Sequence, residues 1–309
     1  MPLALPVLPG SVSAGDSALA EPVAHFATLK SSLLATAVMH EFSQVFPMYS
    51  CFKLSRRLVA LAAACAPLFG ASVVHAELPS IRFDRLTPLG ASPGATVDAE
   101  IAGDDIEEVR SLLFDHPGLT AEPVEGKDRN FRIKVAADVP SGTYDVRLVG
   151  RWGVSNPRLF SVDGGLTDVV DTEPNNEDTT AQKVAVNSAV AGMSDGNNVD
   201  MFRFAASTGQ RIVIDCQAGK LDSMMDATMS LSTAGGKLLA SSSDHNGRDP
   251  MIDFVAPADG EYLVRVYDLS YRGGFPYRLL ITDKSHIENV FPRAVQAGQN
   301  VELLAIGRN

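Results

Sequence analysis

Cysteine is scarce in this chain, and its scarcity excludes a fold that depends on disulfide bonds. The sequence of 309 residues contains 3 cysteines, at positions 51, 65 and 216. We expect the segment that holds the first two to be removed, which would leave Cys216 without a disulfide partner. Cys216 follows Ile212 and Ile214 at alternate positions of a strand-like run, and this pattern predicts a buried, unreactive thiol.

Positive charge is also in short supply. The chain has 26 Lys and Arg against 37 Asp and Glu, a net charge of -11. A nucleic-acid-binding protein needs a basic surface, so the composition predicts no nucleic-acid partner. An acidic balance fits solubility or a requirement for cations.

Motifs of catalysis are missing as well. The sequence has no Gly-x-Ser-x-Gly, no His-Glu-x-x-His and no phosphate-binding glycine loop. Outside the expected leader the histidines are His116, His245 and His286, each in a turn or linker segment without a paired Ser or Cys motif. We therefore expect surface histidines and no catalysis within these residues. A triad assembled from distant positions stays an open alternative.

No apolar run is long enough to suggest a membrane span, and the best candidate is typical of a signal peptide. Residues 53–76 begin with Lys-Leu-Ser-Arg-Arg, continue with a mostly apolar stretch and end in Val-His-Ala. A basic start, an apolar stretch and small residues before a cleavage point define a secretory signal peptide. We therefore assign residues 48–76 to a signal peptide cleaved after Ala76. The mature protein is expected to be secreted, whether periplasmic, on the cell surface or extracellular.

Two alternatives for this leader stay open. A transmembrane helix needs about 20 apolar residues, and Pro67 and Gly70 interrupt the stretch, so we expect no membrane span in the mature chain. A lipoprotein signal at Cys65 is the other alternative. Residues 1–47 do not fit in front of a signal peptide. We expect them to be a non-native extension or a disordered segment, with Met48 as the natural start.

Short β-type runs are abundant in the rest of the chain. Between residues 80 and 285 they alternate apolar and polar side chains and leave no helix-length periodicity. For residues 80–163 the expected strands are 81–86, 95–101, 109–114, 120–124, 131–136, 143–148 and 158–162. Strands of this length and spacing predict a small immunoglobulin-like β-sandwich.

A second β-module spans residues 168–283, behind an acidic linker at 164–178. Its expected strands are 183–190, 200–206, 210–216, 227–233, 237–242, 251–256, 261–268 and 277–282. Turn signals between them, such as Asn246-Gly247, favour a jelly-roll sandwich. The predicted fold class is all-β: tandem β-sandwich modules, an immunoglobulin-like one followed by a jelly-roll-like one, after an N-terminal signal peptide.

Near its end the sequence repeats itself. Residues 88–103 and 292–307 both read Pro-x5-Gly-x2-Val-x5-Gly, and each follows a short apolar run. A repeat marks a module that is used more than once, and a single strand pair cannot bury a core. We therefore expect residues 286–309 to start a truncated second immunoglobulin-like module, with further domains of the same polypeptide beyond it.

Landmarks of a known family occur in order along residues 168–283. They are Glu173-Pro-Asn175-Asn176, Ala181-Gln182, Gly192, Asp200-Met-Phe202-Arg-Phe204, Pro257-Ala-Asp-Gly260-Glu-Tyr262, and Gly274 with Tyr277. At these spacings the segment resembles a bacterial pre-peptidase C-terminal domain. Residues 80–163 and 286–309 resemble immunoglobulin-like IPT/TIG modules more loosely, through Pro88, Gly94 and the Gly142-Thr-Tyr run. The first resemblance implies a non-catalytic β-sandwich found beside secreted peptidases and in surface proteins, with relatives in clostridial collagenases that bind collagen and hold calcium.

Oxygen-bearing side chains cluster before the second sandwich. Asp171, Glu173 and Asn175 stand at alternate positions, and in an extended segment such positions point to one side. Calcium takes about 6–8 oxygen ligands. The resemblance extends the candidate ligand set to Asp171, Glu173, Asn175, Asn176, Asn197 and Asp200.

Two positions depart from the pattern of the calcium-holding relatives. Asn176 and Asn197 stand where acids are usual, and Asp195 is a further acid nearby. Fewer carboxylates mean weaker binding, so we expect a dissociation constant of about 0.1–1 mM. The alternative is a solvated linker with turn-forming asparagines.

Aromatic residues near the end of the second module suggest a weaker hypothesis. Tyr271 and Arg272 lie in a Gly-rich loop, and exposed Tyr and Arg suit the binding of a polymer or protein. Tyr267 and Tyr277 lie in expected strands and are interpreted mainly as core residues. In the collagen-binding relatives, a tyrosine-bearing sheet face touches the ligand.

The sequence thus supports two functional hypotheses. The first is a secreted, non-catalytic binding or accessory module of a larger extracellular or cell-surface protein, stabilised by calcium, with an extracellular polymer or protein surface as partner. The second is an accessory region of a secreted peptidase or other hydrolase whose catalytic domain lies beyond residue 309. Beyond residue 309 the first hypothesis expects more sandwich repeats, and the second expects a motif with paired catalytic residues.

Overall fold

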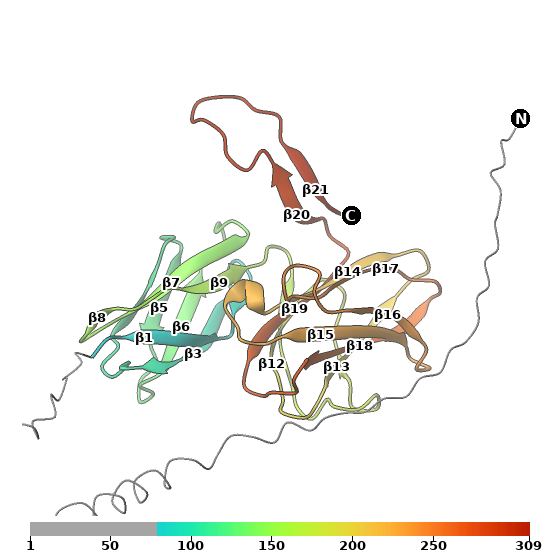
Figure 1. Ribbon diagram of the computed structural model, residues 1–309, viewed down its shortest axis with the longest axis horizontal. Coiled ribbons are helices and arrows are strands. Elements are labelled where there is room, and N and C mark those ends of the chain that lie inside the picture. The colour runs from blue at the N-terminus through green and yellow to red at the C-terminus, as the bar shows by residue number, and fades with distance from the viewer. Residues whose placement is uncertain (1–78) are drawn as a thin grey trace, which may run out of the picture. The chain divides into compact units, whose positions relative to one another are not determined.

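The computed structural model describes residues 79–309, and strands dominate them. The expected extension (1–47) and signal peptide (48–76) lie outside the described residues. In the part described, the only helical element is the short 3-10 turn η2 (Gly219–Leu221), so this part contains no helix with the length and apolar character of a membrane span. The all-β prediction is therefore confirmed (Figure 1).

The first sandwich contains every strand expected from the sequence. Its strands are β1 (Arg82–Thr87), β2 (Gly90–Ala91), β3 (Thr96–Asp104), β4 (Ser111–Phe114), β5 (Leu119–Pro123), β6 (Asn130–Val135), β7 (Gly142–Gly150), β8 (Gly153–Val154) and β9 (Arg158–Val162). Sheet β1-β3-β6-β5 and sheet β2-β9-β7-β4, with β8 beside β7, enclose one core. Strand β6 shows why alternation of apolar and polar residues predicted the strands. Phe131, Ile133 and Val135 are buried, and the residues between them are exposed.

The second sandwich is a jelly roll. Its strands are β10 (Thr167–Val170), β11 (Gln182–Lys183), β12 (Ser188–Met193), β13 (Asp200–Ala206), β14 (Arg211–Gln217), β15 (Ala227–Thr233), β16 (Leu238–Ser242), β17 (Met251–Val255), β18 (Gly260–Asp268) and β19 (Pro276–Thr282). One sheet has the order β10-β12-β19-β14-β17 and the other β11-β13-β18-β15-β16. Without β10 and β11, these are the two four-stranded sheets of a jelly roll.

The chain entering this sandwich differs from the expectation in two places. The segment 164–178, expected as a linker, contains β10, which pairs in parallel with β12. The single strand expected over 183–190 is wrong: β11 ends at Lys183 and pairs with β13, whereas β12 pairs with β19 in the other sheet. The chain crosses between the sheets here, and Asn187 just before β12 has a positive φ of 71°.

The core of the second sandwich includes Cys216. The residue lies on β14 and is fully buried, and burial raises the pKa of its thiol well above the usual value. Ile212 and Ile214 are buried in the same core. The prediction of a buried, unreactive thiol is therefore confirmed.

A buried arginine joins elements of the two sandwiches. Arg278 lies on β19 with 1% of its side chain exposed. Its guanidinium donates to the carboxylate of Asp163 and, over 2.7 Å, to that of Asp168. It also donates to the carbonyl oxygen of Gly90 over 3.0 Å. A buried charge is stable only when it is paired and hydrogen-bonded, and Arg278 meets both conditions.

The last described residues form a hairpin with a two-stranded sheet of its own, in which β20 (His286–Phe291) pairs with β21 (Leu304–Arg308). Its pairing repeats that of β1 with β3. Phe83 lies opposite Gly103, and Ile287 lies opposite Gly307. A β-bulge comes directly after this pair in both cases. The repeat seen in the sequence is therefore also a repeat of strand register.

Candidate metal centre

Three acidic residues from two segments converge at one end of the second sandwich. Asp171 and Glu173 follow β10, and Asp200 is the first residue of β13. One carboxylate oxygen from each lies within 4.8 Å of the others. Parallel pairing of β10 with β12 carries Asp171 to this position, where its amide N–H donates to the carbonyl oxygen of Ala191 over 3.1 Å.

The spacing of these oxygens fits a calcium ion. Calcium–oxygen bonds of about 2.3–2.6 Å allow two ligands of one ion to lie up to about 5 Å apart. Asp200 is almost fully buried, and its Oδ1 has no hydrogen-bond partner among the described residues. The same holds for the buried Oδ1 of Asn176. Unpaired buried acceptors are costly, and a cation at the cluster would supply a partner for the Asp200 carboxylate.

Asp200 is the most perturbed acid of the cluster. Burial raises its pKa to about 8, with further contributions from the neighbouring charges of Asp171, Glu173 and Asp195. The Tyr277 hydroxyl opposes this shift, because it donates to Asp200 Oδ2 over 2.6 Å. At neutral pH the carboxyl therefore needs either a proton or a cation.

Asp171 shows the same effect more weakly. Burial and then the charge of Glu173 raise its pKa to about 6. Three hydrogen bonds act in the opposite direction, among them one of 2.7 Å from Asn175 Nδ2 to Asp171 Oδ1. Converging carboxylates with raised pKa values are typical of a cation site.

The predicted asparagine ligands take different positions. Asn175 is fully buried, and its Oδ1 and carbonyl oxygen both accept from the amide N–H of Met201. Its own amide N–H donates to Glu173 Oε2 over 3.0 Å. Asn175 thus links the acidic loop to β13, while Asn176 keeps a free oxygen. Asn197 lies in an exposed turn, and no hydrogen bond among the described residues joins its side chain to the cluster.

Two supporting residues were not identified as such from the sequence. Tyr277 packs over Gly192, where an added Cβ would lie 2.2 Å from the tyrosine Cζ. Gln182 holds the acidic loop, because its Oε1 accepts from the Thr172 amide and its Nε2 donates to the carbonyl oxygen of Val170, each over 2.8 Å. Both residues are among the family landmarks. The pairing of β12 with β19 places Tyr277 opposite Gly192, and from there its hydroxyl reaches Asp200.

The loop residues Tyr271 and Arg272 are exposed, as expected. Tyr271 is 46% exposed, and its ring stacks on that of Tyr267 with centroids 5.3 Å apart. Tyr277 is buried, as predicted, but Tyr267 is only half-buried and shares this surface. Arg272 is held by Asp268 and lies over the ring of Phe275 at 4.9 Å. The result is a small, pre-organised aromatic and cationic surface.

The fold and this acid cluster define a tandem β-sandwich chain whose second member is a jelly roll with a candidate cation site at its entry. Residues 198–268, from just before β13 to the end of β18, match the sequence profile of the bacterial pre-peptidase C-terminal domain. Over these residues the second sandwich matches the model of this family, whose domain is a non-catalytic accessory domain.

Comparison with curated proteins finds similarity to a probable subtilase-type serine protease of Deinococcus radiodurans, 28% identical over 207 residues. The match covers 60% of this chain, and the chain spans 28% of that relative's length.

Two solved structures show weaker similarity. The pre-peptidase C-terminal domain of collagenase from Bacillus anthracis is 20% identical, with 36% of this chain and 99% of that chain covered and a TM-score of 0.29. SGBP-B of the Bacteroides ovatus mixed-linkage glucan utilization locus is 12% identical, with 66% and 77% covered and a TM-score of 0.24. Similarities at this level carry no argument for function.

Proposed function

We propose that the chain is a secreted, non-catalytic accessory module of a larger extracellular or cell-surface protein, and that calcium stabilises it. Two observations carry the calcium proposal: carboxylate oxygens of Asp171, Glu173 and Asp200 converge, and Asp200 also has a buried oxygen without a hydrogen-bond partner among the described residues. In this proposal Asn176 adds a fourth oxygen. The ion supplies positive charge, and the protein supplies a loop and a strand that the ion joins.

The expected effect of calcium is structural. Asp171 and Glu173 belong to the segment that enters the sandwich, whereas Asp200 belongs to β13. Binding at both would hold the entering segment against the sandwich and remove the repulsion between the carboxylates. A ligand that binds only the folded state raises the melting temperature in proportion to the logarithm of its concentration.

A melting experiment tests this proposal. The full chain should melt at a higher temperature in millimolar calcium than in chelator, and Glu173→Ala should abolish the difference. Glu177→Ala is the matched control, since Glu177 is an exposed acid of the same segment outside the cluster. Equal melting of the unaltered chain with calcium and with chelator would refute the calcium proposal.

The accessory role has a second form, favoured by the similarity to the serine protease. In that form the two sandwiches accompany a peptidase or another hydrolase whose catalytic residues lie outside this chain. The similarity supports it because it extends over 207 residues, beyond the family segment. Sequencing the reading frame past codon 309 separates the two forms: a catalytic motif favours the hydrolase, and further sandwich repeats favour a surface scaffold.

Residues 286–309 are proposed to belong to a second module of the first sandwich's type. The shared register and bulge of the two strand pairs support this assignment. For the partner, we propose an extracellular polymer or protein surface that meets Tyr271 and Arg272. Loss of binding to such a surface in Tyr271→Ala, with binding kept in the control Tyr144→Phe, would support that contact.

A further inference from the structure

A cleft of about 860 Å³ lies where the two sandwiches meet. One wall belongs to β3 and β6 of the first sandwich, where Thr96, Asp98 and Glu100 lie on the exposed face of β3. The other wall is formed by β10, the residues that follow it, and the end of β12 in the second sandwich. Pockets for ligands are usually about 300–1,000 Å³, so the cleft has room for a short segment of a partner.

Negative charge dominates the lining of this cleft. Arg132 pairs with Asp98 over 2.7 Å. Arg278 pairs with Asp168 over the same distance. These are the two basic residues in the lining, and four of the acids there have no basic partner in it, which favours a cationic ligand. The acids that line the cleft are Asp98, Glu100, Asp168, Asp171, Glu173 and Asp195.

Two of these acids are free of every described side chain. Glu100 on β3 and Asp195 after β12 form no ion pair and no side-chain hydrogen bond with a described residue. Basic neighbours just outside the lining do not cancel the excess. Arg85 donates to a backbone carbonyl oxygen over 2.9 Å, and Lys127 lies near Asp98. With both of them counted, six acids still face four bases.

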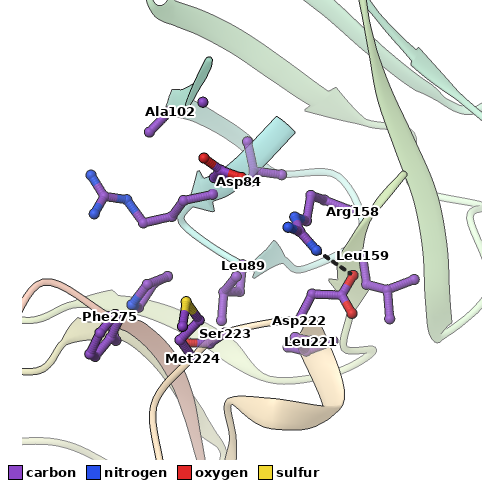
Figure 2. A pocket seen from close by; sticks show the side chains of 14 residues that line it. Asp84, Leu89, Ala102, Arg158, Leu159, Leu221, Asp222, Ser223, Met224 and Phe275 are labelled. Atoms are coloured by element: carbon purple, nitrogen blue, oxygen red, sulfur yellow. Dashed lines mark ion pairs between the residues drawn. The ribbon is translucent and has the colours of Figure 1, made fainter. Parts of the chain in front are cut away.

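A smaller pocket at the same junction, of about 270 Å³, lacks this imbalance. It is lined by two arginines, Arg85 and Arg158, and by two acids, Asp84 and Asp222. Figure 2 shows the Arg158 guanidinium directed toward Asp222, with Nη1 and Oδ2 separated by 3.9 Å. Opposite charges are thus equal in number there. The junction as a whole does not select a cation, whereas the larger cleft does.

The free edge of β10 favours a polypeptide as the cationic ligand. The amide N–H groups of Thr167 and Asp171 donate to carbonyl oxygens at and just before β12. Because the N–H groups of a parallel strand alternate in direction, those of Asp168 and Val170 point away from β12. Val170 lines the cleft and is 75% exposed. An extended peptide can form main-chain hydrogen bonds with such an edge.

We propose that this cleft binds an extended basic segment of a partner protein. Its arginine or lysine side chains pair with Glu100 on the first sandwich and with Asp195 on the second. Apolar lining residues take the aliphatic stems of these side chains. They include Pro88, Val97 and Met193.

The proposal does not depend on calcium. The cleft shares Asp171 and Glu173 with the candidate metal centre, whereas Glu100 and Asp195 lie outside that cluster of three acids. An ion at the cluster would add two positive charges. With Asp200 counted among the acids, seven negative charges would then face four positive ones. The basic segment should therefore bind in the presence of calcium as well as in its absence.

Calorimetric titration of the full chain in millimolar calcium tests the proposal. The acetylated and amidated peptide Ala-Arg-Ala-Arg-Ala should bind. The analogue with Gln in place of each Arg should bind about tenfold or more weakly, because it cannot pair with the acids. Cadaverine, a diamine with the same charge and no peptide backbone, should also bind more weakly. The affinity of the basic peptide should fall as salt rises from about 0.05 to about 0.5 M.

Three results would overturn the proposal. The first is equal affinity for the Arg and Gln peptides, or no binding of the Arg peptide. The second is cadaverine binding as tightly as the Arg peptide, which would contradict a polypeptide ligand. The third is binding in chelator that calcium abolishes, which would place the positive charge in the acid cluster. Failure of the calcium melting experiment would leave this proposal intact, so the two can be judged separately.

Substitutions on both walls assign the binding to the cleft. Glu100→Gln and Asp195→Asn should each weaken binding of the Arg peptide about threefold, and together about tenfold, because each removes one charge pair. Neither side chain has a described partner, so both variants should fold. Asp138→Asn is the matched control, since Asp138 is an exposed acid of the first sandwich outside the lining. An unchanged affinity in the double variant would contradict the site.

Discussion

The strand pair β1–β3 and the hairpin β20–β21 have the same register but opposite environments. Phe83 is 0% exposed and its counterpart Ile287 is 64% exposed, and Leu86 at 1% corresponds to Val290 at 37%. The same contrast in exposure holds for the partner strand β3, where the fully buried Ala99 corresponds to Leu303, which is 56% exposed. The same local sequence pattern thus forms the same pairing with and without a core.

The comparison separates pairing from burial. Pairing and the bulge follow from the local sequence, since both copies have them. Burial requires a second sheet, which β2-β9-β7-β4 supplies to the first copy. A strand pair alone is marginally stable in water, so the two copies should respond very differently to the same change.

Truncating matched apolar residues of the two strand pairs should give the largest difference in the free energy of unfolding. Phe83→Ala should lower the free energy of unfolding of the first sandwich by about 3–5 kcal/mol, because it leaves a cavity in the core. Ile287→Ala should change the free energy of unfolding by less than about 0.5 kcal/mol, because Ile287 is 64% exposed. Chemical denaturation followed by circular dichroism, which reports the strands of both regions, measures both changes. Similar losses in the two variants would contradict the comparison.

Adding a methyl group at the matched glycines of the two strand pairs should give a smaller difference in stability. A Cβ at Gly103 would lie 1.9 Å from the carbonyl oxygen of Arg82, and one at Gly307 would lie 2.0 Å from that of His286. Gly103→Ala should destabilise the first sandwich by about 1–3 kcal/mol, because the backbone must move within a packed core. Gly307→Ala should leave the melting temperature unchanged and disturb only the hairpin. A loss of melting temperature in Gly307→Ala would show that the hairpin is coupled to a core.

A buried acid should make stability depend on pH in a way that an exposed one does not. The pKa of Asp200 is about 8 in the folded chain and near 4 when unfolded. Between these values the folded state binds more protons, so without calcium stability should fall as pH rises from 5 to 8, by up to about 1.4 kcal/mol per pH unit.

Matched variants isolate this dependence on pH. Asp200→Asn should remove most of the slope, whereas Glu302→Gln, an exposed acid of the tail, should not change it. Saturating calcium should remove it too, because the ion replaces the proton. Melting temperatures from pH 5 to 8 test this, and stability that rises with pH in chelator would contradict it.

The smallest expected difference between the two strand pairs is in the rate of backbone hydrogen exchange. Backbone amides of β20 and β21 should exchange with solvent faster than those of β1 and β3, because no second sheet covers the hairpin in the part of the chain that the structure describes. Hydrogen–deuterium exchange measured by mass spectrometry reports both copies in one sample. Exchange in residues 286–308 as slow as in β18 and β19 would show that the hairpin is protected by contacts of its own.

Much of the fold could be predicted because alternation is local. The runs at Phe131, Tyr144 and Tyr262 predicted their strands within a few residues, since every second side chain in each meets a core. The predictions failed where the chain changes sheet, around Asn187, and where an acidic segment joins a sheet as β10. Nothing in a local pattern reports which strand a segment will pair with.

The residues of the candidate site also fall into those that could be predicted from the sequence and those that could not. Asp171 and Glu173 could be identified from their spacing, whereas Asp200 could be identified only through the family resemblance. The hydrogen bond from the Tyr277 hydroxyl to Asp200 could not be predicted, because the two residues are distant in the sequence.

The sequence by itself thus determined the all-β class, the order of the strands, the repeat and the acids that could hold a cation. These depend on side-chain periodicity and local spacing, which act over a few residues. The tertiary structure alone decided which apolar faces are buried and which carboxyl groups have a raised pKa. Burial and desolvation depend on segments that meet only after folding, and both vary with surroundings that no local pattern contains.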